Sequence, residues 1–294
     1  MRLNHNQLGR PKTWLLSSLI GLNMSIFINK PVNAFVPYIF EPNTKDLENV
    51  SINFGKTTAR LIHFGQIKEA LRWAKLGVRL NPNDERLWAI LAEAQVRNNL
   101  IKEASLSLAK AKAINPKDAN LWFAEGSLSL QQKNPNNAIL QITKGLSIEP
   151  NNANAYFQLG NARIMQSKFR LALQAFKKAA SIKTTFWEAM NNQGLVLFEM
   201  GKTQQAINIW RNVLQIKENA EPMLALAAAL NQSNQRSQES LSLAKKALTL
   251  NPNYVSLKHQ EEQLWGRKLQ KATQELLKDP NLTDDVERAL ANSN

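Results

Sequence analysis

Few side chains in this sequence have the types and spacing that catalysis or metal binding requires. The 294 residues include no cysteine, and the three histidines, His5, His63 and His259, lie far apart, which argues against thiolate chemistry and a metal cluster. We find no Walker loop, dinucleotide-binding glycine motif, HExxH or GxSxG. A helix N-terminus accounts for the paired acids Asp284 and Asp285. The sequence therefore predicts a protein that is not an enzyme and binds no metal or cofactor.

The chemistry that the sequence does offer is recognition of another polypeptide by amide and apolar side chains. Amides donate to and accept from a peptide backbone, while Phe, Ile and Met accept apolar side chains. For several of these residues, above all Ile164 and Phe198, a place in the core is the alternative, since apolar helix positions are usually buried. The candidate binding residues are Asn120, Phe123, Asn154, Phe157, Asn161, Ile164, Met165, Asn191, Asn192 and Phe198.

Basic side chains provide two further candidates. Arg86 and Arg97 stand near Glu93, where they either bind an acidic segment or pair with Glu93. A net charge of +14 favours anionic partners, but no nucleic-acid motif is present and no nucleic acid is expected. Four lysines recur at multiples of 34 residues and form a stripe. This stripe either binds an anionic membrane or an acidic protein, or it keeps the protein soluble. Its members are Lys110, Lys144, Lys178 and Lys246.

A repeat of about 34 residues between Ser51 and Tyr254 has to position these side chains. Small residues recur once in each unit, at Ala70, Ala104, Ala138, Ala172, Ala206 and Ser240. A second ladder of small residues is Thr58, Ala92, Gly126, Gly160, Gly194 and Ala228. Small side chains at fixed points let two helices approach closely. Sequences such as NPND at 81–84 and NPKD at 115–118 break the helices between units, because proline disfavours helical geometry in the residue before it.

These ladders and breaks resemble the tetratricopeptide repeat (TPR) family over about two thirds of the chain. The resemblance implies an all-α, right-handed superhelical solenoid of antiparallel helix pairs, whose first helices line a concave surface that binds extended peptides or helices. Some family members grip a C-terminal carboxylate with asparagines and cations. Asn161 and Asn192 match the asparagines, but Phe157, Pro222 and Leu226 replace the cations, so such a clamp is not expected. The six repeats are 51–84, 85–118, 119–152, 153–186, 187–220 and 221–254.

The N-terminal residues have the pattern of a targeting segment. Residues 1–34 combine a basic start, an apolar run at 14–28 and small residues before a cleavage point, as in a signal peptide. If the segment is retained, residues 14–28 form a membrane anchor. Both outcomes place the body of the protein in the periplasm or thylakoid lumen, and only the third alternative, an untargeted tail, does not. Residues 35–50 are a lead-in to a long helix beginning near Lys45, and their apolar part either packs on the first repeat or meets a partner or membrane.

The C-terminal residues predict a cover for the end of the stack. Residues 255–279 have one apolar face, as a capping helix requires, and residues 280–294 form a short tail. We therefore expect a secreted bacterial scaffold or assembly factor, similar in style to exported proteins of photosynthetic bacteria that assist membrane-complex assembly. The alternative is an accessory subunit of a cell-envelope enzyme or export system. A regulatory part of an enzyme is disfavoured, because the segment after Tyr254 is too short for a catalytic domain.

Overall fold

The computed structural model describes residues 43–233 and 238–293, and within these residues every regular element is a helix. The expected leader at 1–34 and most of the lead-in lie outside the described residues. The α-helices are α1 Thr44–His63, α2 Ile67–Leu80, α3 Glu85–Arg97, α4 Ile101–Ile114, α5 Ala119–Gln131, α6 Pro135–Ile148, α7 Ala153–Met165, α8 Phe169–Ile182, α9 Trp187–Glu199, α10 Thr203–Ile216, α11 Ala220–Gln232, α12 Gln238–Leu250, α13 Leu257–Glu262, α14 Arg267–Leu277 and α15 Thr283–Asn292. Two 3-10 turns are η1 Pro252–Val255 and η2 Pro280–Leu282.

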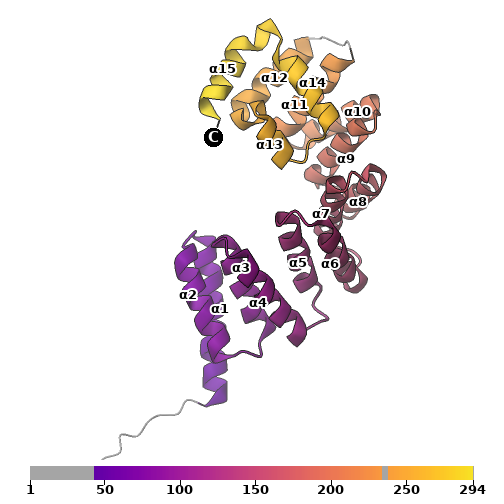
Figure 1. Cartoon of the computed structure of the whole chain (residues 1–294). Coiled ribbons are helices and arrows are strands. Elements are labelled where there is room, and N and C mark those ends of the chain that lie inside the picture. The colour runs from indigo at the N-terminus through magenta and orange to yellow at the C-terminus, as the bar shows by residue number, and fades with distance from the viewer. Residues whose placement is uncertain (1–42, 234–237, 294) are drawn as a thin grey trace, which may run out of the picture. The chain divides into compact units, whose positions relative to one another are not determined.

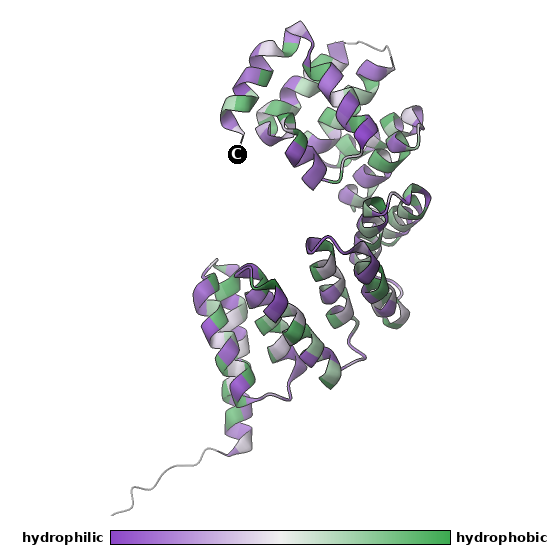
Figure 2. Cartoon of the chain, in the orientation of Figure 1, coloured by the Kyte–Doolittle hydropathy of each residue, from purple (hydrophilic) through white to green (hydrophobic). Residues whose placement is uncertain are grey.

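Helices α1 to α12 form consecutive antiparallel pairs, and each pair packs against the next (Figure 1). The first helices of successive pairs begin one repeat length apart, at Glu85, Ala119, Ala153 and Trp187. Hydrophobic and hydrophilic residues are interspersed along these helices (Figure 2), which lets each helix bury one side and leave the other in water. The expected all-α repeat array is confirmed.

Contacts between a small and a large side chain hold the two helices of a pair together. Gly160 on α7 lies against the ring of Phe176 on α8, and Gly194 on α9 lies against Trp210 on α10. A Cβ atom at either glycine would overlap the aromatic ring. The first ladder of small residues is fully buried at Ala70, Ala104, Ala138, Ala172 and Ala206. The small residues are therefore needed for the close approach of the helices.

The breaks between pairs are held by side-chain caps. Asp84 accepts a hydrogen bond of 2.9 Å from the backbone N–H of Arg86 and so caps α3. The indole N–H of Trp88 donates to the carbonyl of Pro82 at 2.7 Å, which fixes the turn to the helix that follows. Asp118, Asn152 and Asn219 cap later first helices in the same way. Of the two junctions without proline, the one before α9 has no side-chain cap, whereas the one before α11 is capped by Asn219.

The prediction of a single capping helix over 255–279 is wrong. The chain there forms η1, α13 and α14, with Leu264 in the left-handed region at φ 62° between the two helices. Helix α14 packs against α11 and α9, whereas α15 and the 3-10 turns pack against α12. The end of the stack is thus covered by α15, and α14 lies on the first helices of the last two pairs.

The turn inside each of the first five pairs contains one residue with positive φ, at Gly65, Asn99, Lys133, Ser167 and Gly201. A non-glycine residue in this conformation costs about 1 kcal/mol. We expect Lys133→Gly to raise the free energy of unfolding by about 0.5–1 kcal/mol, measured by urea denaturation. The matched change Lys110→Gly, at an exposed position inside α4, should lower it by about 1 kcal/mol. Equal effects of the two changes would contradict the assignment of strain to the turn.

Candidate functional site

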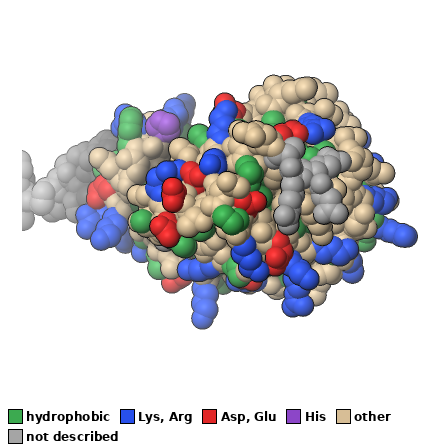
Figure 3. All heavy atoms as spheres, turned by 90° about the horizontal axis from the view of Figure 1, so that it is seen from above, with side chains coloured by type: hydrophobic (Ala, Val, Ile, Leu, Met, Phe, Trp, Pro, Cys, Tyr) green, Lys and Arg blue, Asp and Glu red, His purple; other side chains and the backbone are tan. Residues whose placement is uncertain are grey.

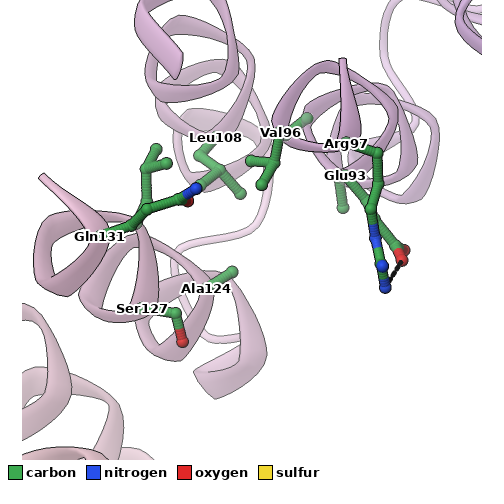
Figure 4. A pocket seen from close by; sticks show the side chains of 10 residues that line it. Glu93, Val96, Arg97, Leu108, Ala124, Ser127 and Gln131 are labelled. Carbon is green, nitrogen blue, oxygen red and sulfur yellow. Dashed lines mark ion pairs between the residues drawn. The ribbon is translucent and has the colours of Figure 1, made fainter. Parts of the chain in front are cut away.

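The open part of the first-helix surface contains a cavity of about 710 Å³ between α3 and α5. Figure 4 shows Val96 and Gln131 pointing into this space from α3 and α5, with Leu108 of α4 at its floor. Glu93 and Arg97 form an ion pair of 3.9 Å at the rim, and both side chains are more than half exposed. The lining also includes Ala89, Ala92, Ala124, Ser127 and Leu128. The cavity therefore combines an apolar floor with a charged rim, which suits an apolar side chain of another polypeptide.

A second cavity, of about 450 Å³, lies where α5 and α7 approach α13. Leu130, Asn161 and Met165 line it from the repeats, and Lys258, Glu261, Glu262 and Leu264 line it from the C-terminal segment. Two of the predicted binding residues, Asn161 and Met165, therefore do border a cavity. The C-terminal segment forms the opposite wall, which the sequence did not predict.

Four of the predicted binding residues are buried, so their expected place on an open surface is wrong. Phe198 is 2% exposed and its ring centroid lies 6.0 Å from that of Trp210. Phe123 fills the space beside Gly145. Asn191 and Asn192 are buried in α9. Neighbouring helices cover these side chains, so their contacts stabilise the packing of the helices.

The other apolar candidates on α7 also pack against protein. Phe157 is half-buried between Phe176 and Phe186, with ring centroids 5.7 and 5.1 Å away. Ile164 packs against the same aromatic cluster and borders a further cavity near Trp265. The alternative interpretation of Ile164 and Phe198 as core residues is thus the better one.

The exposed polar candidates pair locally. Asn120 and Asn154 are exposed, and the Asn120 amide donates to Asp118 at 3.0 Å. Arg86 pairs with Asp84 at 2.6 Å rather than with Glu93. This contact lowers the pKa of Asp84 and raises that of Arg86, through the charged hydrogen bond between them. Arg97 remains the candidate cation beside the first cavity.

The lysine stripe is exposed at all four positions, Lys110, Lys144, Lys178 and Lys246. Lys144 lies 5.9 Å from the centroid of the Trp122 ring, and Lys246 pairs with Glu218. In the view of Figure 3, basic side chains are spread over the surface among acidic ones and do not form one patch.

Amides predicted to bind a partner instead bind each other, and with Glu221 they form a string of polar side chains across three first helices. The Asn192 amide donates to Asn161 on α7 at 3.0 Å, and the Asn191 amide lies 3.4 Å from the Asn192 oxygen. Asn191 is also hydrogen-bonded to Glu221 in the first turn of α11. This string of polar groups runs from the second cavity to the surface of α11 that α14 covers.

Helix α14 lies on the first helices α9 and α11 and is attached through two glutamates. The carboxylate of Glu199 accepts from the backbone N–H groups of Leu269 at 3.0 Å and Lys268 at 3.3 Å, so it caps the positive end of α14. The Lys268 ammonium returns a bond of 2.7 Å to the Glu199 carbonyl. A Cβ at Gly266 would overlap the Glu199 side chain. Any other residue at position 266 would require the Glu199 side chain to move from this cap.

The second glutamate, Glu221, lies in a buried polar cluster. The indole N–H of Trp265 donates to its carboxyl at 3.0 Å, and Tyr254 and Asn191 are also hydrogen-bonded to it. Burial raises the pKa of Glu221 to about 7, and these three donors offset that rise only in part. Burial and the neighbouring carboxylate raise the pKa of Tyr254 as well. Trp265 is thus held by a carboxyl group that titrates near neutrality.

Sequence reasoning missed this attachment, although two signals were present. Helix α11 is apolar on nearly every side, with buried residues from Ala220 and from Pro222 through Leu230, and such a helix needs cover on all faces. Gly266 also interrupts the expected capping helix. Together they indicated a helix that turns back onto α11. The described helices include none long and apolar enough to cross a bilayer, and the described residues hold no group of three potential metal ligands of the His, Asp or Glu type.

No protein-family model and no curated protein matches this sequence. Solved structures do match the fold. PilF of Pseudomonas aeruginosa is 18% identical with a TM-score of 0.64, over 74% of this chain and 98% of PilF. PilW, a widely conserved type IV pilus biogenesis factor, is 17% identical with a TM-score of 0.62, over 76% and 97% of the two chains. YrrB, a TPR protein with an unusual peptide-binding site, is 16% identical with a TM-score of 0.51, over 65% and 94%. The TPR resemblance is confirmed at the level of the fold.

The raised pKa of Glu221 predicts that stability falls as pH rises. The unfolded carboxyl titrates near 4.5 and the folded one near 7, so the folded chain binds the proton more tightly in this interval. Its contribution is complete below about pH 4.5 and is lost as pH rises to about 7. We expect Glu221→Gln to remove about 1–3 kcal/mol of this decline, measured by urea unfolding at several pH values. Glu218→Gln, an exposed neighbour, should leave the decline unchanged, and an equal effect would contradict the assignment.

Proposed function

We propose that this chain is a non-catalytic scaffold that binds another protein through the open surface of α3, α5 and α7. The observation that carries the proposal is the cavity between α3 and α5, where an apolar floor opens beside the Glu93 and Arg97 ion pair. Helix α14 occupies the corresponding surface of α9 and α11. A partner can therefore reach the surface of α3, α5 and α7 without displacing α14.

The solved structures support this class of function. YrrB is a TPR protein with a peptide-binding site, and PilW is a biogenesis factor of type IV pili. The second of these favours a related candidate, an accessory or assembly protein of a cell-envelope system. The two candidates share the same binding surface and differ in the partner.

We further propose that the protein acts outside the cytoplasm, in the periplasm or thylakoid lumen. The support is the basic start, apolar run and small residues of 1–34 in the sequence. The lysine stripe at 110, 144, 178 and 246 is exposed, which allows it to lie against an anionic membrane surface.

A substitution that fills the first cavity tests the binding surface. Peptides selected from a phage-displayed library on the full chain should lose about tenfold or more in affinity to Ala124→Trp, because the indole would occupy the cavity. Ala124 is exposed, so the melting temperature should stay nearly unchanged. The control Ala109→Trp, exposed on α4, should bind as the original chain does. Peptides that bind all three proteins equally would refute the proposed surface.

A reporter fusion tests the location. Residues 1–34 fused to an alkaline phosphatase without its own signal should give active enzyme, because this phosphatase needs oxidising conditions to form its disulfides. Replacing Leu16 and Leu19 with Asp shortens the apolar run and should abolish the activity. An inactive fusion that is nevertheless stably produced would exclude export through this segment.

A further inference from the structure

Helix α14 occupies the first-helix surface of the last two pairs in the way a bound ligand would. Its residues Leu269, Ala272, Thr273 and Leu276 are buried and recur at the helical spacing of one face. Trp265 precedes this helix and is buried against the cluster around Glu221. The surface of α9 and α11 thus receives an aromatic residue, a glycine and then an amphipathic helix.

The chain connecting this helix to the rest carries strain. Leu264, immediately before Trp265, has φ 62°, a conformation that a leucine adopts at an energetic cost. Release of α14 from its place would let Leu264 relax.

The interface also leaves polar atoms without partners. The Thr273 hydroxyl is fully buried on the face that packs against the repeats, and it has no hydrogen-bond partner among the described residues. The same holds for the Asn191 side-chain oxygen beside Glu221. A buried polar group without a partner weakens an interface relative to an apolar group of the same shape. A different helix, with an apolar residue in place of Thr273, would fit this surface better.

An empty surface is not a stable alternative. Helix α11 has ten buried residues, nearly all apolar, and α14 packs against this helix, so its departure would expose apolar surface to water. Departure of α14 therefore requires that another helix takes its place.

We propose that the surface of α9 and α11 is a second binding site, which takes an amphipathic helix of a partner protein in exchange for α14. A cavity of about 530 Å³, lined by Ile164, Glu199, Leu264, Trp265 and Gly266, lies directly beside the attachment of α14. Its lining shares Glu261 and Leu264 with that of the second cavity at α7. A partner on the open surface, as proposed above, therefore reaches this attachment, although the second site itself does not depend on that proposal.

A synthetic peptide of residues 263–279 serves as the probe, with its affinity for the full chain measured by fluorescence anisotropy. Gly266→Ala in the chain should tighten peptide binding by about tenfold, because the added methyl group overlaps Glu199 and loosens α14. Hydrogen exchange should show faster exchange of the α14 amides in this variant when the peptide is added. Gln274→Ala, on the exposed face of α14, is the matched control and should change neither quantity.

Thr273→Val tests the same exchange in both directions and keeps α14 in place. In the chain it should hold α14 more firmly and weaken peptide binding, whereas in the peptide it should strengthen binding, because in each case the orphaned hydroxyl is removed. Peptide affinity that is independent of these changes would overturn the proposal. A concentration-dependent dimer of the Gly266→Ala chain would also overturn it, since the occupant would then be the tail of a second copy.

Discussion

The close approach of two helices at small residues is the contact on which the array depends. Gly160 and Gly194 lie under Phe176 and Trp210, and a single methyl group at either position would collide with the ring. Because this contact recurs from one repeat to the next, each pair presents its first helix on the same side. The position of the binding surface therefore depends on how the opposite face of each first helix packs against its second helix. Substitutions at the glycines would displace the whole surface, whereas substitutions at exposed residues such as Ala124 change only its lining.

The surface is divided by a difference in composition between the first helices. Helix α3 keeps charged residues such as Glu93 and Arg97 on its open side, whereas α11 is apolar nearly all round. The first can remain in water and the second cannot. Helix α14 therefore covers apolar surface of α11 that the second helix of that pair leaves open. Glu199 adds direction to this contact, since its carboxylate accepts only the N-terminal end of a helix.

The sequence predicted the fold well because its signals are periodic. The repeat spacing, the proline breaks and the small residues all specify contacts between neighbours in the chain. The binding residues were predicted less well, because α7, α9 and α11 are separated by whole helices and burial there depends on where α14 lies. The sequence predicted that Asn191 and Asn192 are available to a partner. In the structure Asn191 is hydrogen-bonded to Glu221, and Asn192 to Asn161. The apolar composition of α11 and the glycine at 266 were the signals that could have revealed this.

The polar string from Asn161 to Glu221 connects the two parts of the surface. Asn161 borders the second cavity, and Glu221 holds Trp265 at the attachment of α14. A ligand group that hydrogen-bonds Asn161 would compete for the Asn192 amide, and Asn192 in turn lies against Asn191. Loss of the Asn191 contact leaves the Glu221 carboxylate with fewer donors in a buried site, which is unfavourable unless it is protonated or exposed. The open surface and the attachment of α14 therefore border one string of hydrogen-bonded side chains, in which each group has a limited number of partners.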